Sequence, residues 1–179
     1  MVITQTHKKY PYRKRNRLRV WDYSTPHWYY VTICTQNHRE LFGEIIKGKM
    51  VLNEYGKIAD KYWREIPDHF SDIRLDEYII MPNHIHGIII IEDPSEVRNG
   101  HARSVRRQHQ KLPVTIGSFK SAISRTINKM QNDFKFQWLK SYYDHIIRDE
   151  KSLDNIRLYI RENSLSWETD KNNPENLKY

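Results

Sequence analysis

Apolar and polar residues follow two periods along the chain, one of two residues and one of about 3.6. Five segments predict β-strands, because they are short and rich in β-branched and aromatic residues. These segments span residues 27–35, 47–52, 73–81, 84–92 and 142–147. Pro82 separates the third segment from the fourth. Because proline has no amide hydrogen to donate, we expect a bend or a tight connection there.

Three other segments repeat their apolar residues every three to four positions, which is typical of amphipathic helices. They span residues 53–66, 116–130 and about 149–162. Asn53 is a suitable cap for the first helix, and Pro67 predicts its end. Either Asp149 or Ser152 can cap the last helix.

The predicted elements follow the order strand, strand, helix, strand, strand, helix, strand, helix. Without strict alternation of strands and helices, this order favours an α+β fold in which helices pack on an antiparallel sheet. We expect residues 21–167 to form one folded domain, after a basic arm at 1–20 and before a polar, extended tail at 168–179. Residues 93–113 lack periodicity and predict a long loop, of the kind that is usually functional or mobile.

Composition narrows the class of protein. The 179 residues suit a single domain, and an apolar content of 38% is too high for a disordered chain. Cys34 is the only cysteine, which excludes a disulfide framework and a cysteine-based zinc site. The longest aliphatic run, 88–91, is far shorter than the ~20 residues of a membrane-spanning helix, and the N-terminus does not resemble a secretory signal. We therefore expect a soluble cytoplasmic protein with no membrane partner.

The net charge of +8 is unevenly distributed. Seven basic and no acidic residues lie in 1–20, and five basic and no acidic residues lie in 98–111, which leaves the remaining residues with a net charge of −4. Basic clusters of this kind, with tyrosines and tryptophans nearby, favour a nucleic-acid partner over the alternative of a solvated tail and loop. The candidate contacts to a nucleic-acid backbone are Lys14, Arg15, Arg17, Arg106, Arg107 and Lys120.

His84 and His86 are the first candidates for chemistry. They lie two positions apart on a predicted strand, so both side chains point to one face of the sheet while Ile85 points to the other. Two imidazoles in this arrangement can bind one divalent ion, although a catalytic metal site normally has three protein ligands. The alternative is a pair of structural histidines packed on the strand.

Tyr159 and Asn163 could complete such a site. They are four positions apart on the last predicted helix and therefore share a side of it. An amide oxygen is a suitable ligand for Mg²⁺ or Mn²⁺, and a phenol is a nucleophile once it has lost its proton. With 12 tyrosines in the chain, a packing role for Tyr159 is the alternative. Tyr142 and Tyr143 are rival nucleophiles, but neither has an amide residue four positions later.

Several separated motifs together resemble one protein family. They are MPNHIHGIIII, SYYDHIIRDEKSLDNIRLYIRENSLSWE and DKNNPENL, with YVTICTQNHRELFGEI and GKMVLNEYGKIA upstream. In this order they resemble the REP-associated tyrosine transposases, which belong to the single-tyrosine HUH transposases of single-stranded DNA. The resemblance extends from about Trp21 to Leu177, which is nearly the whole chain.

Residue by residue, the resemblance implies a metal site and a nucleophile. His84 and His86 match the two metal-binding histidines of the HUH motif. Tyr159 matches the nucleophilic tyrosine, and Asn163 matches the amide residue that completes the metal site. Family members commonly have Asn-Pro after this helix, whereas Ser164 follows Asn163 here, which leaves open an inactive copy.

The resemblance also implies a fold and an activity. The fold would be a ferredoxin-like sandwich of the HUH endonuclease type. The activity would be that of a bacterial DNA-strand transferase, a monomer or a homodimer, which uses Mg²⁺ or Mn²⁺. It would cut single-stranded or REP-like hairpin DNA, link a 5′-phosphate to tyrosine and free a 3′-hydroxyl. Two alternatives stay open: a non-catalytic nucleic-acid-binding module on the same fold, and a metal-dependent nuclease that uses water.

Three remaining residues have less specific signals. His145 lies on a predicted strand within one of the family-like motifs, and we expect a structural histidine rather than a metal ligand. Trp138 and Trp167 are expected to pack within the protein rather than to stack on bases.

Overall fold

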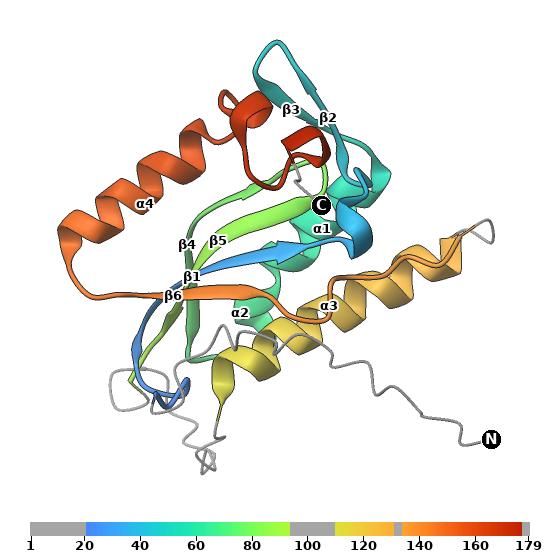
Figure 1. Cartoon of the computed structure of the whole chain (residues 1–179). Coiled ribbons are helices and arrows are strands. Elements are labelled where there is room, and N and C mark those ends of the chain that lie inside the picture. The colour runs from blue at the N-terminus through green and yellow to red at the C-terminus, as the bar shows by residue number, and fades with distance from the viewer. Residues whose placement is uncertain (1–20, 94–109, 131–133, 177–179) are drawn as a thin grey trace, which may run out of the picture.

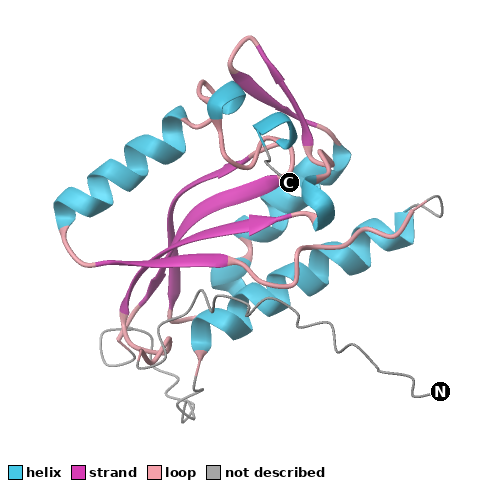
Figure 2. Cartoon of the chain, in the orientation of Figure 1, coloured by secondary structure: helices cyan, strands magenta, loops and turns pink. Residues whose placement is uncertain are grey.

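The computed structural model describes residues 21–93, 110–130 and 134–176 and contains one main sheet, a separate hairpin and four α-helices (Figures 1 and 2). The strands are β1 (His27–Cys34), β2 (Gly43–Ile46), β3 (Lys49–Leu52), β4 (Ile73–Ile80), β5 (His84–Ile91) and β6 (Tyr143–Ile147). The helices are α1 (Glu54–Arg64), α2 (Ile66–His69), α3 (Lys111–Met130) and α4 (Glu150–Glu162), with short 3₁₀ turns η1 (Gln36–His38), η2 (Trp167–Thr169) and η3 (Pro174–Asn176).

The main sheet has the strand order β4-β5-β1-β6, and every neighbouring pair is antiparallel. Without the β2–β3 hairpin, the short helix α2 and the last helix α4, the order of strands and α-helices is β1, α1, β4, β5, α3, β6, which is the βαββαβ order of a ferredoxin-like fold. The predicted α+β class and antiparallel sheet are therefore confirmed. The strand that carries His84 and His86 is central in the sheet, as the resemblance implied.

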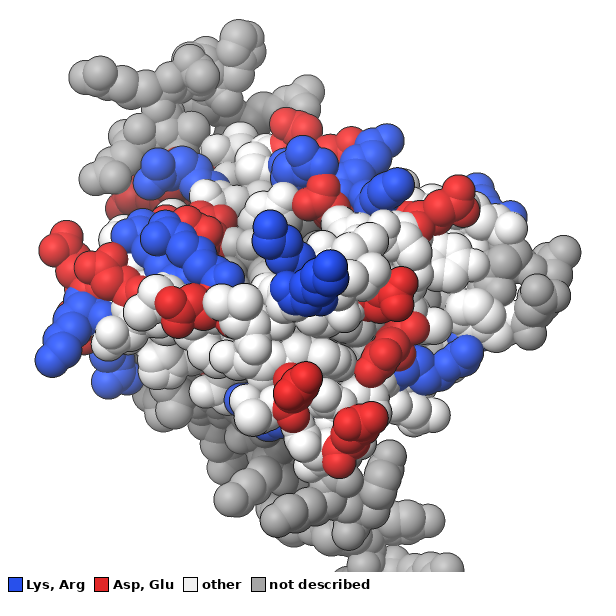
Figure 3. All heavy atoms as spheres, turned by 90° about the horizontal axis from the view of Figure 1, so that it is seen from above, with Lys and Arg blue, Asp and Glu red and all other residues white. Residues whose placement is uncertain are grey.

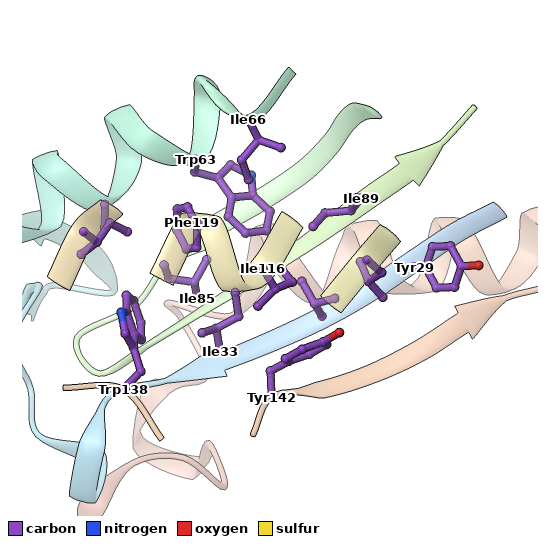
Figure 4. Close-up of a cluster of buried hydrophobic side chains, with 14 of the residues drawn as sticks. Tyr29, Ile33, Trp63, Ile66, Ile85, Ile89, Ile116, Phe119, Trp138 and Tyr142 are labelled. Carbon is purple, nitrogen blue, oxygen red and sulfur yellow. The ribbon is translucent and has the colours of Figure 1, made fainter. Parts of the chain in front are cut away.

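One face of the sheet packs against α1 and α3 and forms the larger core (Figure 4). Ile85 and Ile89 of β5 point into this core, where Trp63 of α1 and Phe119 of α3 meet edge to face, with their ring centroids 5.2 Å apart. Gly87 lies between the two isoleucines, and a Cβ atom there would come within 2.2 Å of the Trp63 ring. The close approach of strand and helix therefore requires glycine at this position.

The other face of the sheet packs against α4, and its apolar cluster is smaller. Ile88 and Ile90 of β5 contribute to this cluster, together with Leu153 and Ile160 of α4. Because side chains alternate along a strand, His84 shares this face with both isoleucines. The histidines of the motif therefore lie under the helix that carries Tyr159.

Several predicted boundaries were wrong for local reasons. The predicted strand at 47–52 begins at Lys49, because Lys47 and Gly48 form the hairpin turn, with φ of 51° and 73°. The partner strand β2 was not predicted, since it has only four residues and includes Gly43 and Glu44. Pro67 does not end the first helix: α1 stops at Arg64, and Pro67 lies in the first turn of α2.

The predicted loop at 93–113 is shorter than expected, because α3 already begins at Lys111. Pro113 lies in the first turn of this helix, where proline is tolerated. The Lys111 ammonium pairs with the Asp72 carboxylate, so this lysine of the basic segment has a structural partner. Residues 94–109 and the predicted basic arm, 1–20, lie outside the described residues.

The prediction that residues 168–179 form an extended tail was also wrong. Residues 168–176 fold against the site. Asp170, Asn172 and Asn173 are buried there. Their short polar side chains satisfy the local backbone: Asp170 Oδ1 accepts from the Asn172 amide at 2.6 Å, and Asn173 Nδ2 donates to the Trp167 carbonyl at 3.0 Å. Among the described residues, no helix has the length and apolar character needed to cross a membrane.

Candidate metal and tyrosine site

The histidine pair occupies a buried pocket between β5 and the C-terminal segment. His84 and His86 are both inaccessible to solvent, and their Nε2 atoms face each other at 2.9 Å. Burial lowers the pKa of both imidazoles below the usual range, and for His86 the neighbouring His84 adds to the shift. Both rings are therefore neutral near pH 7 and available as ligands.

Asn83 fixes the tautomer of His84. The Asn83 amide donates to the carbonyls of His38 (3.0 Å) and Asn172 (2.7 Å), so its Oδ1 faces His84 and can only accept. His84 Nδ1, at 2.7 Å from that oxygen, must carry the proton. The lone pair of His84 is consequently on Nε2, the atom that faces His86. An orienting partner of this kind is typical of a metal-binding histidine.

The β1 strand supplies the partners of His86. Its Nδ1 lies 2.7 Å from the Tyr30 hydroxyl and 2.9 Å from Thr32 Oγ1. The Tyr30 ring also stacks on the imidazole, with 5.5 Å between the ring centroids. Both contacts hold the Nε2 atom of His86 toward His84.

Tyr159 on α4 and Asn163 at the C-terminal cap of this helix both lie beside the histidine pair and Asp170. The Tyr159 hydroxyl lies 3.4 Å from His86 Nε2 and 3.4 Å from Asp170 Oδ2, while the side chain stays 41% exposed. Burial and the Asp170 carboxylate raise the pKa of the phenol, and a hydrogen bond with Asn163 opposes the rise. The tyrosine is therefore accessible but neutral, and it would need a cation or a base to become a nucleophile.

Asp170 was not predicted. It is buried, and its Oδ2 accepts a hydrogen bond from Asn163 Nδ2 at 3.1 Å. Donor atoms of His84, His86 and Asp170 all lie within 4.8 Å of one another. The sequence around Asp170, DKNN, belongs to the last family-like motif, but the motif does not show which strand it contacts. In the structure this run lies beside the start of β5, where Asn83 donates a hydrogen bond to the Asn172 carbonyl.

The donor set fits a divalent cation. Two neutral imidazoles and a carboxylate are common metal ligands, and an amide oxygen adds a hard donor suited to Mg²⁺ or Mn²⁺. Asn163 Oδ1 is buried and has no hydrogen-bond partner within the described part of the chain, so a bound cation would satisfy it. His84, His86 and Asp170 can therefore hold a metal ion together, and Asn163 Oδ1 is a candidate for a further ligand.

Two ion pairs fix α4 over the sheet. Arg157 donates to both carboxylate oxygens of Asp76, at 2.8 and 2.6 Å, and Arg161 donates to Glu77 Oε1 at 3.0 and 2.5 Å. A register shift in β4 at Asp76 and Glu77 interrupts the alternation of the strand, so these neighbouring residues both reach the helix. The two arginines flank Tyr159 in sequence and hold its turn of α4 in place.

The other candidate aromatic residues take different positions. Tyr142 is buried in the larger core, and Tyr143 is 44% exposed beside Tyr30. The expected packing role of Trp138 is confirmed, because its side chain lies in the larger core. Trp167 packs against the site itself, where its ring stacks on His84 at 6.0 Å.

His145 does not have the enclosed surroundings expected of a structural histidine. It lies on β6 with an exposed side chain, at the edge of the main sheet.

Of the predicted DNA contacts, the structure describes only Lys120. This lysine lies on α3, on the opposite face of the sheet from the site, and its ammonium donates to the carbonyls of Leu139 (2.7 Å) and Lys140 (3.3 Å). The other five, Lys14, Arg15, Arg17, Arg106 and Arg107, lie outside the described residues. On the face shown in Figure 3, basic and acidic side chains are mixed, with no continuous basic patch in the described part.

The chain matches no protein-family model. It is 39% identical over 166 residues to an uncharacterized protein of Haemophilus influenzae, and the match covers 89% of this chain and 92% of that protein.

Solved structures give the fold. A REP-associated tyrosine transposase bound to a REP hairpin superposes with a TM-score of 0.58 and 12% identity, over 84% of this chain and 73% of that one. A presumed transposase of Deinococcus radiodurans R1 superposes with a TM-score of 0.47 and 17% identity, over 83% of this chain and 96% of that one. The chain belongs to the same family as the Haemophilus influenzae protein and has the fold of a REP-associated tyrosine transposase.

Proposed function

We propose that the protein is a metal-dependent DNA-strand transferase of the transposase type, acting on single-stranded or hairpin DNA. The observation that carries the proposal is the position of the Tyr159 hydroxyl, 3.4 Å from His86 Nε2 and 3.4 Å from Asp170 Oδ2. A partly exposed tyrosine beside a metal-ligand set is the arrangement needed for nucleophilic attack on a phosphodiester. The fold shared with a transposase bound to a REP hairpin supports this choice of substrate.

In this proposal, His84, His86, Asp170 and Asn163 hold one divalent cation. When bound, the cation would polarise the scissile phosphate and stabilise the charge that develops on it. Mg²⁺ and Mn²⁺ are the cations that suit the mixed imidazole and oxygen donors.

Tyr159 is the proposed nucleophile. Its Oη attacks phosphorus, so that the Oη–P bond forms while the bond from phosphorus to the 3′-oxygen breaks. Asp170 is committed to the cation, so the phenolic proton is lost to water, and the departing 3′-oxygen takes a proton from water to become a hydroxyl. The product is a 5′-phosphotyrosine, which keeps the energy of the phosphodiester and can be rejoined to another 3′-hydroxyl.

The test is a denaturing gel of the protein with 3′-end-labelled hairpin DNA and Mn²⁺. The label marks the fragment that would stay on the protein, and hairpins from the DNA flanking the coding region are the first substrates. We expect the label to migrate with the wild-type protein, and to be lost from it in Tyr159→Phe but not in the control Tyr55→Phe on α1. Cleavage without an adduct would instead indicate a hydrolytic nuclease, and binding without cleavage a non-catalytic module.

A further inference from the structure

A groove lies between the edge strand β6 and the first turns of α4, next to the candidate site. It is shallow and open to solvent, with a volume of about 430 Å³. Its lining includes Tyr30, Tyr143, His145, Ser152, Asn155 and Ile156. A second hollow of about 450 Å³ adjoins it, and four residues line both hollows: Tyr143, His145, Asp149 and Ser152.

The groove is continuous with the site through Tyr30. This ring lines the groove, stacks on His86, and meets the Tyr159 ring edge to face with 6.3 Å between centroids. On its other side it meets the Tyr143 ring edge to face at 6.4 Å. A DNA strand whose phosphate reaches Tyr159 would therefore have its neighbouring nucleotide beside Tyr30 and Tyr143.

The chemistry of the groove suits an unpaired nucleotide. Tyr143 is 44% exposed, and aromatic rings in this setting stack on bases of any sequence. The Lys171 ammonium lies over one face of the Tyr143 ring, 5.5 Å from its centre, so a base would stack on the opposite face. Lys151 lines the groove and can contact phosphate oxygens. Asp149 also lines the groove, but its carboxylate is engaged with the Ser152 amide as the helix cap.

We propose that this groove is a binding subsite for the unpaired nucleotide next to the scissile phosphate, with Tyr143 as the stacking platform. The inference rests on the proposed function and adds a substrate position to it. The subsite takes single strands and not duplexes, because a paired base is stacked within its own helix and cannot present its face to a tyrosine ring.

The experiment measures binding without cleavage. The protein carries Tyr159→Phe and is kept in EDTA, and the probes are a fluorescein-labelled dT12 strand and the same strand with abasic sites. We expect Tyr143→Ala to raise the dissociation constant for dT12 by about 5- to 150-fold, and Tyr143→Phe to leave it nearly unchanged. The control Val51→Ala removes a similarly exposed strand side chain, 46% exposed on β3, and should have no effect.

The abasic strand separates stacking from contacts to the backbone. We expect Tyr143→Ala to make no difference to its binding, because it offers no base to the ring. Illumination of a 5-iodouracil version of the dT12 strand should then cross-link the tryptic peptide 141–148. Equal affinity of Tyr143→Ala and the unsubstituted protein for dT12, or cross-links confined to other peptides, would overturn the subsite.

The outcome is independent of the test of the chemistry. If an adduct forms at Tyr159 but Tyr143→Ala binds dT12 as tightly as the unsubstituted protein, the subsite is refuted and the strand-transferase proposal stands. If Tyr143→Ala binds dT12 more weakly but no adduct forms at Tyr159, the nucleotide-binding groove is supported and the proposed reaction is refuted.

Discussion

The two faces of β5 have opposite characters, although the strand is buried along its whole length. Toward α1 and α3 it presents isoleucines and one glycine to a large apolar core. Toward α4 it presents Ile88 and Ile90 and then His84 and His86, whose polar atoms meet Asn83, Tyr30 and Thr32. One face supplies stability, and the other holds two imidazoles whose Nδ1 atoms are hydrogen-bonded to neighbouring side chains and whose Nε2 atoms face each other. The period of two in a strand allows this division within eight residues.

A matched pair of substitutions on β5 gives the largest expected difference. Ile89 and Ile88 are both fully buried and adjacent, but Ile89 faces the larger core and Ile88 the smaller cluster. We expect Ile89→Ala to lower the free energy of unfolding by about 4–5 kcal/mol and Ile88→Ala by about 2–3 kcal/mol, because the smaller cluster can relax around a cavity. Urea denaturation of the two variants measures this, and equal losses would contradict the division.

Metal addition should stabilise the face that carries the histidines. A cation that binds only the folded protein adds about 2.7 kcal/mol of stability at 100 times its dissociation constant. Mn²⁺ should therefore raise the Tm of the wild-type protein but not that of His86→Ala or Asp170→Ala. The control Asp68→Ala, which removes an acidic residue of α2, should keep the response. A Tm shift in His86→Ala equal to that of the wild type would place the cation elsewhere.

Acid should destabilise the metal-free protein through the same face. Burial depresses the pKa of His84 and His86 in the folded state, so the unfolded chain binds more protons below about pH 6.5. Stability from these neutral histidines is therefore present above that pH and is lost as the pH falls, by about 1.4 kcal/mol for each unit of pKa difference. Denaturation between pH 7 and pH 5 in EDTA should show this slope. A variant with both histidines changed to Gln should have a clearly smaller slope.

The ion pairs between α4 and β4 should have the smallest effect. Arg157→Met breaks the partly buried bidentate pair with Asp76 and should cost about 1 kcal/mol, together with a lower rate of adduct formation because Tyr159 is less firmly placed. Arg161→Met breaks a more exposed pair with Glu77 and should change less. If Arg161→Met lowered the rate of adduct formation more than Arg157→Met did, the expected order of the two ion pairs would be contradicted.

The sequence predicted what depends on local periodicity. The strands and their histidine spacing and the helix face shared by Tyr159 and Asn163 follow from side-chain direction within one element. The register shift at Asp76 and Glu77, which lets two acidic residues reach α4, leaves no such pattern. Local patterning likewise gave no sign that the polar tail folds back.

Asp170 shows the limit most clearly. A run of Asp and Asn after a helix is typical of a loop, and nothing local says which strand it will meet. Its position depends on the hydrogen bond from Asn83 to the Asn172 carbonyl and on that from Asn163 to Asp170, which join segments up to 89 residues apart. The resemblance supplied the motif around Asp170, and the fold supplied its neighbours.

The central claim, that Tyr159 is the nucleophile, is tested most directly by mapping the covalent adduct. Trypsin releases Tyr159 in the peptide 158–161 and the rivals Tyr142 and Tyr143 together in the peptide 141–148. After reaction with hairpin DNA and Mn²⁺ and nuclease trimming, mass spectrometry should find the nucleotide mass on 158–161. A nucleotide on 141–148, or cleaved DNA with no modified peptide, would contradict the account.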